Sequence, residues 1–168
     1  TWINSHLPKN TVLLSPSFMN TLYLNSFTSA RPYLPAFLTT FMPTREIETR
    51  FVYANKAFGV SDDVFTERVT MKTLYTFESA LEIYGYTYVN KIALEKKYSY
   101  FTPFDIPIIN IDYPPEPRIE ALIKSYRDIN PNWPDIAADY IYNGPLEKRF
   151  GGKTDFPREQ GLKLVYKN

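Results

Sequence analysis

The sequence contains no cysteine, so disulfide bonds, thiolate catalysis and cysteine-based metal sites are excluded. It has one histidine, His6, so a transition-metal site is not expected either. His6 falls where a short helix is expected to end, which favours a surface or capping role. A catalytic triad would have to use it, and no Gly-x-Ser-x-Gly turn is present. The sequence therefore points to no catalytic residue, no metal and no cofactor.

Long apolar runs and runs of one charge are also missing. No stretch of about 18 apolar residues could span a bilayer, and the first residues lack the basic and apolar regions of a signal peptide. The net charge is +1, with no run of like charges, so a general nucleic-acid binder is not expected. A chain of 168 residues fits one domain with a substantial core.

Aromatic residues and proline are abundant instead. The chain has 14 Tyr and 12 Phe, and 14 Pro against 6 Gly. Tyrosine tolerates a half-wet setting, which suits surfaces that touch sugars, membranes or proteins. A bulky core explains the same composition, so both interpretations stay open.

Apolar residues at helical spacing predict several helices. The clearest face runs through Ile47, Phe51, Ala54 and Phe58, and Gly59 is expected to end that helix. Helices are expected at residues 2–6, at 18–27, at 44–58, after 61, around 74–84 and at 117–128.

Capping residues mark where these helices begin. Thr44 is expected to cap one helix and Ser61 the next. Asp62 and Asp63 then fall in a first turn, where the helix dipole favours negative charge, and this explains them more simply than a cation or sugar-phosphate site. Pro117 suits the first position of the later helix.

Short apolar and aromatic runs predict strands between the helices. They are expected at residues 11–15, 86–92, 106–113, about 137–142 and 161–168. The last two are expected to be joined by an Asn-Gly-Pro turn and a charged loop. Strands alternating with helices indicate an α/β fold. The prediction is a single domain over residues 1–168, a layered sandwich with a small mixed sheet of four or five strands, flanked by helices, and a long helical and aromatic insertion at about 33–104.

Acidic residues gather around the strand predicted at 106–113. Asp105, Asp112 and Glu116 could hold a ligand there, since α/β domains bind ligands at strand ends. Solvated surface acids explain the same pattern. These acids leave a free-standing hydrolase open as an alternative function.

Both ends of the chain carry sequence motifs that occur together in a known superfamily. The segments are Trp2 to Ser15, the Ser29-Ala30-Arg31-Pro32 stretch, Ala138 to Glu147, and Leu162 to Asn168. They resemble the region after the last transmembrane helix of C-fold-type glycosyltransferases that use lipid-linked sugars. Ser29-Ala30 departs from the Thr-Gly that is usual there. The abrupt start and end of the chain also suggest a piece of a larger protein.

The resemblance implies a membrane-attached domain on the extracytoplasmic face, with an accessory or binding role. The catalytic acids of that superfamily lie in loops between transmembrane helices, so none is carried over to this chain. The implied partners are the transmembrane part of its own protein and a lipid-linked sugar or acceptor. The expected ligand-binding residues are Arg31, Trp133, Tyr140 and Tyr142. A role in the fold, and not in catalysis, is expected for Asp139, Gly144 and Glu147. A plain carbohydrate- or protein-binding module is the remaining alternative.

Overall fold

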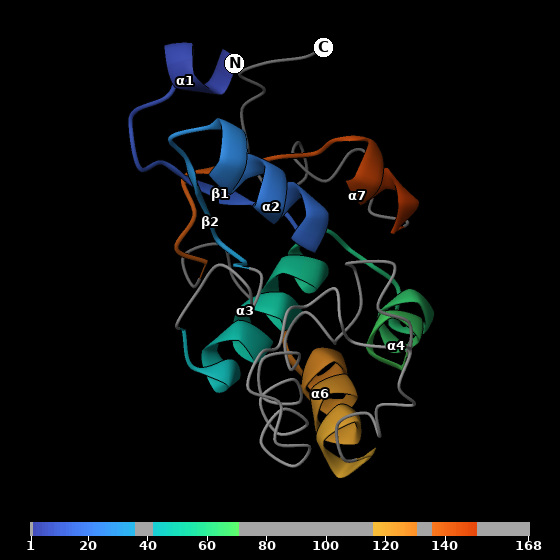
Figure 1. The fold of residues 1–168 in the computed structure, drawn as a ribbon. Coiled ribbons are helices and arrows are strands. Elements are labelled where there is room, and N and C mark those ends of the chain that lie inside the picture. The colour runs from blue at the N-terminus through green and yellow to red at the C-terminus, as the bar shows by residue number, and fades with distance from the viewer. Residues whose placement is uncertain (1, 36–41, 71–115, 131–135, 151–168) are drawn as a thin grey trace, which may run out of the picture.

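The computed structural model describes residues 2–35, 42–70, 116–130 and 136–150 of the chain. These residues are 60% helical and form a helix-rich α/β arrangement with one small sheet (Figure 1). In chain order the elements are α1 (Trp2–His6), β1 (Val12–Leu14), α2 (Phe18–Phe27), β2 (Arg31–Pro32), α3 (Thr44–Ala57), α4 (Asp62–Thr70), α6 (Glu116–Asp128), β3 (Tyr140–Ile141) and α7 (Pro145–Arg149).

The three described strands form a parallel sheet in the order β2-β1-β3. Val12 of β1 is paired with Arg31 of β2, and Leu13 is paired with Tyr140 of β3. The strands expected at 86–92, 106–113 and 161–168 lie outside the described residues. The predicted strands at 11–15 and 137–142 are confirmed, and their pairing brings segments more than 120 residues apart into one sheet.

Strand β1 is central and faces two apolar clusters. Leu14 belongs to the main core, whereas its neighbour Leu13 packs in a smaller cluster with Leu24 of α2 and with Ala30. This alternation follows from the period of two in a strand, which points successive side chains to opposite faces. A short parallel strand buried on both faces needs the continuous apolar run Val12-Leu13-Leu14.

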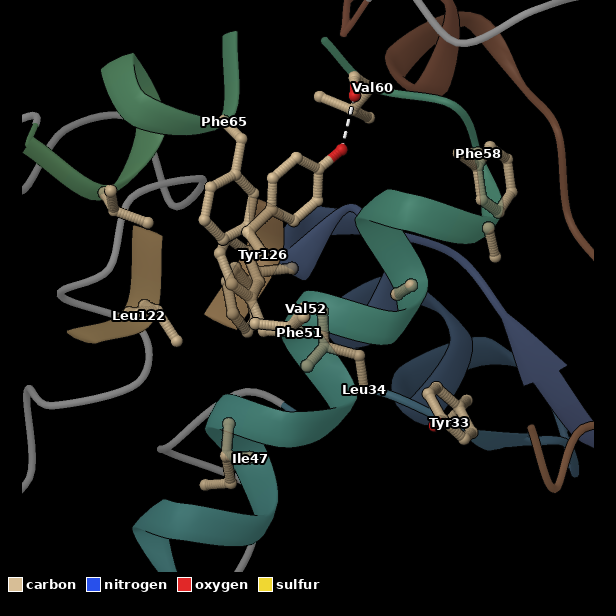
Figure 2. Packing of buried hydrophobic residues seen from close by; sticks show 14 of the residues in the cluster. Tyr33, Leu34, Ile47, Phe51, Val52, Phe58, Val60, Phe65, Leu122 and Tyr126 are labelled. Atoms are coloured by element: carbon tan, nitrogen blue, oxygen red, sulfur yellow. Dashed lines mark hydrogen bonds between the residues drawn. The ribbon is translucent and has the colours of Figure 1, made fainter. Parts of the chain in front are cut away.

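The main core lies where α3, α4 and α6 meet (Figure 2). Phe51 of α3 and Phe65 of α4 pack side by side, and the Tyr126 ring of α6 stacks on Phe65 with 3.8 Å between ring centroids. The Tyr126 hydroxyl donates a hydrogen bond to the Val60 carbonyl. The predicted face through Ile47, Phe51, Ala54 and Phe58 is thus confirmed for α3, and the helices expected after 61 and at 117–128 are confirmed as α4 and α6.

Helix α3 begins differently from the prediction. Thr44 is its first residue rather than its cap, because Pro43 occupies the N-cap position and its carbonyl accepts bonds from the Glu46 and Ile47 amides. The end of the helix is confirmed, since Gly59 follows it with φ 62°, a left-handed conformation that glycine adopts without strain. Ser61 caps α4 as expected, accepting a bond from the Val64 amide at 3.3 Å.

The expected charged loop after β3 is wrong in its first part. Pro145 opens the short helix α7, because its missing N–H costs nothing at a first helical position. Glu147 then turns back and accepts a bond from the Gly144 amide at 2.9 Å. A residue expected on a charged loop is therefore buried, with 1% of its surface exposed.

Helices α3 and α4 fall within the segment expected as an insertion at about 33–104. They nevertheless supply a large share of the main core, including Phe51, Val52 and Phe65. This part of the segment is integral to the packing of the described chain. The domain boundaries themselves stay a prediction.

Candidate functional site

The carboxyl edge of the sheet holds a cluster of buried polar side chains. This carboxyl-edge cluster consists of Ser15, Ser17, Asn20, Asn55, Arg68 and Glu147, each at most 8% exposed. They come from the β1–α2 turn and from α2, α3, α4 and α7. In parallel sheets this edge is where ligands usually bind, so its contents decide whether the chain has such a site.

Glu147 is the acceptor at the centre of one half of the cluster. Its Oε1 accepts hydrogen bonds from the Ser15 hydroxyl at 2.5 Å and from the Asn20 side-chain amide. Its Oε2 accepts the bond from Gly144. Three donors therefore satisfy a carboxylate that would be very costly to bury alone.

Arg68 fills the other half. Its guanidinium donates to the Pro16 carbonyl at 2.8 Å and to the Asn55 side-chain oxygen. It also lies against the Phe150 ring, 4.0 Å from the centroid, and near Phe51 at 4.9 Å. Such cation–π contacts keep a desolvated guanidinium stable.

The two halves together close the carboxyl edge. The β1–α2 turn binds both, Glu147 through the Ser15 hydroxyl and Arg68 through the Pro16 carbonyl. Both charged groups of the carboxyl-edge cluster, Glu147 and Arg68, are thus bound by groups of the chain itself. The arrangement ties α2, α4 and α7 to the end of β1, which is a structural role.

The amino edge of the same sheet is organised in the opposite way. We define the amino-edge surface as Trp2, His6, Lys9, Tyr23, Phe27 and Arg31, which come from α1, the α1–β1 loop, α2 and β2. Tyr23 and Phe27 are 53% and 63% exposed, the large exposed hydrophobic residues of the described chain. Their rings stack one helical turn apart, with 6.3 Å between centroids.

Backbone and side-chain hydrogen bonds join the parts of this surface. Asn4 of α1 donates to the Phe27 carbonyl at 3.2 Å and accepts from the Ser29 amide at 2.8 Å. The Asn10 amide donates to the Ser29 carbonyl at 3.0 Å, and the Arg31 amide donates to the Thr11 carbonyl. These bonds hold α1 and the loop after it against the end of α2, at the end of the molecule far from α6 (Figure 1).

Helix α1 carries its own ring pair. The His6 ring stacks on Trp2 with 4.6 Å between centroids, and the His6 Nδ1 lies 3.0 Å from the Trp2 carbonyl. His6 is exposed, which confirms the surface role expected for it.

The three predicted ligand-binding residues that the structure describes lie apart from one another. Arg31 lies exposed on edge strand β2, and Tyr140 lies half-buried on the opposite edge strand against the Leu13 cluster. Tyr142 follows β3 at the carboxyl edge, where its amide donates to the Leu14 carbonyl. Trp133 lies outside the described residues. Of these residues only Arg31 belongs to the amino-edge surface.

Tyr142 instead packs against its own turn. A Cβ on Gly144 would lie 2.8 Å from the Tyr142 ring, so the ring occupies the space that a side chain would need. Burial, together with the negative charge of Glu147, raises the pKa of the Tyr142 phenol. Asp139 accepts a bond from the Val12 amide at 2.8 Å. Gly144, Glu147 and Asp139 thus all have contacts that shape the architecture, as expected.

The acids proposed for a hydrolase fall mostly outside the described residues. Asp105 and Asp112 lie there, and Glu116 is the first residue of α6. Within the described ranges no three His, Cys, Asp or Glu residues are grouped so that they could hold a metal ion. The hydrolase stays an untested prediction.

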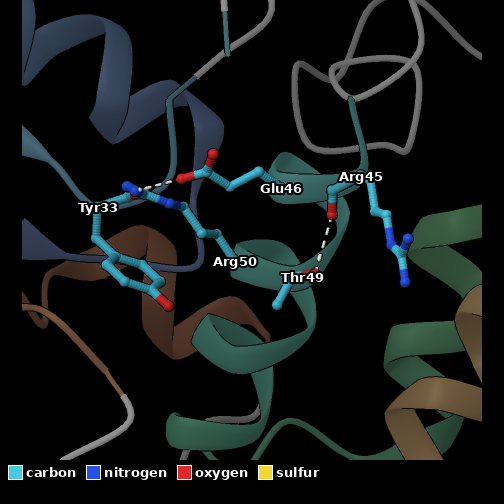
Figure 3. A network of polar contacts seen from close by, with 5 residues as sticks. All are labelled: Tyr33, Arg45, Glu46, Thr49 and Arg50. Carbon is cyan, nitrogen blue, oxygen red and sulfur yellow. Dashed lines mark hydrogen bonds and ion pairs between the residues drawn. The ribbon is translucent and has the colours of Figure 1, made fainter. Parts of the chain in front are cut away.

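A cleft of about 410 Å³ lies between α3 and α6. Arg45, Glu48 and Thr49 line it from α3, and Arg118 and Ser125 from α6, over a floor that includes Val52 and Leu122. The Arg118 guanidinium pairs with Glu48 at 2.8 Å. Figure 3 shows Arg45 extending away from the other network of α3, in which Arg50 binds the Glu46 carboxylate and the Tyr33 carbonyl.

Sequence reasoning missed Arg68, the tyrosine–phenylalanine pair and the cleft. Arg68 sits at helical spacing from Phe65, on the buried side of α4, and this spacing was the available signal. Tyr23 and Phe27 stand four residues apart within a predicted helix, yet nothing in that pattern says which side faces water.

The described helices include none with the length and hydropathy needed to cross a membrane. Comparison with protein-family models, with curated proteins and with solved structures gives no match.

Proposed function

We propose that this chain is the accessory domain of a multi-pass, glycosyltransferase-like membrane protein, attached on the extracytoplasmic face. Its amino-edge surface would lie toward the bilayer and the transmembrane part of its own protein. The observation that carries this proposal is the exposed Tyr23–Phe27 stack beside the Trp2-bearing helix α1. Aromatic side chains favour the membrane–water interface, where a ring is partly desolvated while its polar tip stays wet.

The closed carboxyl edge supports the same orientation. Glu147 and Arg68 are satisfied within the chain, whereas the other edge carries the exposed rings and cations of the amino-edge surface. The resemblance of the two chain ends to C-fold-type glycosyltransferases adds the class of parent protein and the extracytoplasmic side. In this proposal the domain is a layered sandwich that helps to shape the entrance for a lipid-linked sugar or an acceptor, and catalysis belongs to another part of the parent.

Tryptophan fluorescence can test the orientation. Trp133→Phe leaves Trp2 as the single tryptophan, since the chain has two. We expect vesicles with brominated acyl chains to quench it. In the converse variant, Trp2→Phe, Trp133 is the single tryptophan. Quenching of its fluorescence would show that the membrane-facing surface includes Trp133.

The aromatic pair should carry the binding. Tyr23→Ser/Phe27→Ser should weaken partitioning into phosphatidylcholine vesicles about tenfold, which corresponds to about 1.4 kcal/mol of lost apolar contact. Arg45→Ser/Lys124→Ser is a matched control, because both side chains are exposed on α3 and α6 at the far end. Equal partitioning of the two double variants would contradict the proposal.

A small-anion binding module is the second candidate, and the α3–α6 cleft favours it. Arg45 makes no ion pair within the described residues, and it shares the cleft with the Arg118–Glu48 pair. Inorganic phosphate should then shift the amide signals of Thr49 and Ser125 in NMR spectra. Arg45→Gln should abolish these shifts, whereas Arg127→Gln on the other side of α6 should leave them. Shifts that are equal in both variants would exclude the cleft.

A further inference from the structure

We infer that the amino-edge surface binds anionic lipid headgroups through Lys9 and Arg31. The inference rests on the proposed function, which turns this surface toward a bilayer, and it adds the chemistry of the partner. The aromatic pair accounts for affinity to any bilayer, whereas the two cations would select for negative charge.

The distribution of acids along the chain is the first observation. Residues 1–45 contain no Asp or Glu, although the whole chain has 18 of them, so all 18 lie within residues 46–168. The acid-free segment builds α1, β1, α2 and β2, and it includes Lys9, Arg31 and Arg45. A chain with a net charge of only +1 thus begins with a segment whose charged side chains are all basic.

The second observation is that the two cations are neighbours and that, among the described residues, no acid pairs with either of them. The bonds from Asn10 to Ser29 and from Arg31 to Thr11 hold the loop that contains Lys9 beside the start of β2. Both side chains belong to exposed residues. Neither forms an ion pair within residues 2–35, 42–70, 116–130 and 136–150.

One described acid does reach this edge. Asp139 of the segment before β3 lies beside β1, and its Oδ2 accepts the Val12 amide at 2.8 Å. A backbone amide therefore already engages this carboxylate, and two cations oppose one acid. Among the described residues, the balance of charge at the amino edge stays positive.

This combination fits a lipid surface better than other polyanions. Proteins that bind duplex nucleic acid usually neutralise about 6–10 phosphates, whereas this surface offers two cations between exposed rings. Aromatic rings flanked by a few cations are typical of surfaces that lie at the level of lipid headgroups. Each Lys or Arg near an anionic bilayer strengthens binding about fivefold.

Vesicle flotation with the whole chain tests the inference. We expect vesicles with about one third phosphatidylglycerol to bind at least about tenfold more tightly than pure phosphatidylcholine vesicles. Lys9→Gln/Arg31→Gln should remove most of this difference, about 25-fold for two charges, and leave binding to phosphatidylcholine unchanged. Salt at about 0.5 M should have the same effect, because it screens exposed charges.

The matched control removes the same charge elsewhere. Lys124→Gln/Arg127→Gln changes two exposed cations on α6, and it should alter binding to anionic vesicles less than about twofold. A loss as large as that of Lys9→Gln/Arg31→Gln would overturn the inference, because net charge alone would then explain the binding. Circular dichroism should show all four variant sites to be neutral for folding.

The outcomes also separate this inference from the proposed function. Equal binding to both vesicle types, lost in Tyr23→Ser/Phe27→Ser, would overturn the anionic preference and leave the membrane-facing surface intact. No binding to either vesicle type would overturn both.

Discussion

The two edges of one small sheet differ in which side chains they bury. Polar and charged side chains are buried at the carboxyl edge, and large apolar rings are exposed at the amino edge. At the carboxyl edge the Glu147 carboxylate and the Arg68 guanidinium are buried. The carboxylate accepts hydrogen bonds from three donors of the same chain. At the amino edge two aromatic rings are exposed, and Lys9 and Arg31 make no ion pair within the described residues. The polar groups described at the carboxyl edge are satisfied by the chain itself. The exposed rings and cations of the amino-edge surface are available to bind a partner.

The difference is informative because parallel sheets usually bind ligands at the carboxyl edge. Here the Ser15-Pro16-Ser17 turn is bound by Glu147 on one side and by Arg68 on the other. Ser17 also caps α2, accepting a bond from the Asn20 amide at 3.1 Å. The buried polar side chains of the carboxyl-edge cluster hold helices in place. We therefore expect a partner to bind at another part of the molecule.

Removing the Glu147 carboxylate should give the largest effect. Glu147→Ala leaves the buried Ser15 and Asn20 donors and the partly buried Gly144 amide without their acceptor, and we expect a loss of about 3 kcal/mol or more in the free energy of unfolding. Urea unfolding followed by circular dichroism would measure it.

The control is Glu46→Ala, which removes a half-exposed partner of Arg50. It should cost no more than about 0.5 kcal/mol. A Glu147→Ala protein as stable as the parent chain would break the comparison, because residues kept for ligand binding often cost stability rather than add to it.

Arg68 should give the next largest effect. Arg68→Met keeps the apolar stem against Phe51 and Phe150 but removes the donors to Asn55 and to the Pro16 carbonyl. We expect a loss of about 2 kcal/mol. Adding Asn55→Leu should recover part of it, since replacing both partners leaves fewer unsatisfied polar groups. Arg127→Ala, which removes an exposed partner of Asp62, is the control and should be close to neutral.

Much of the local structure was predictable because it depends on local signals. The helix at residues 18–27 and the face through Phe51 follow from apolar spacing, and Gly59 ends α3 because of its positive φ. Thr44 was placed wrongly because a proline carbonyl can serve the first turn without any capping side chain. Both are decisions taken within a few residues.

The contents of the two edges were not predictable in the same way. Glu147 meets Ser15 across a separation of 132 residues, and Arg68 meets Pro16 across 52. No periodicity of the sequence predicts such distant pairs. An acid in the segment Pro-Leu-Glu-Lys-Arg has the sequence pattern of an exposed residue, and only its partners in the fold show that it is buried. Arg31, Tyr140 and Tyr142 were predicted together as ligand-binding residues. The sequence did not show that they lie on different strands and edges of the sheet, because an aromatic in a strand has the same sequence signature on either side.

Alkaline pH should sharpen the comparison at a smaller scale. Burial raises the pKa of the Tyr33 phenol from 10.0 to about 12, an effect that the nearby Arg50 partly offsets. Because the folded state then holds its proton more tightly than the unfolded chain, Tyr33 stabilises the fold below pH 10, and this contribution is lost as the pH rises from 10.0 to about 12. Tyr33→Phe should therefore flatten the fall in urea midpoint above pH 10.

The same measurement on two other tyrosines sets its limits. Burial also raises the pKa of Tyr126, so Tyr126→Phe should flatten the alkaline fall as well, with an added loss at neutral pH from the missing bond to the Val60 carbonyl. Tyr23→Phe is the control, because that ring is 53% exposed on the amino-edge surface. A change in slope for Tyr23→Phe would mean that this phenol is buried in the folded chain.

The smallest effect on stability is expected where the effect on binding is largest. Tyr23→Ser/Phe27→Ser removes two exposed rings and their stack, which is worth about 0.2–0.5 kcal/mol on a helix surface. The free energy of unfolding should stay within about 0.5 kcal/mol of the parent chain while partitioning into vesicles falls. A loss of more than about 2 kcal/mol would show that the rings support the fold. In that case the amino edge would be as self-contained as the carboxyl edge, and the contrast between them would disappear.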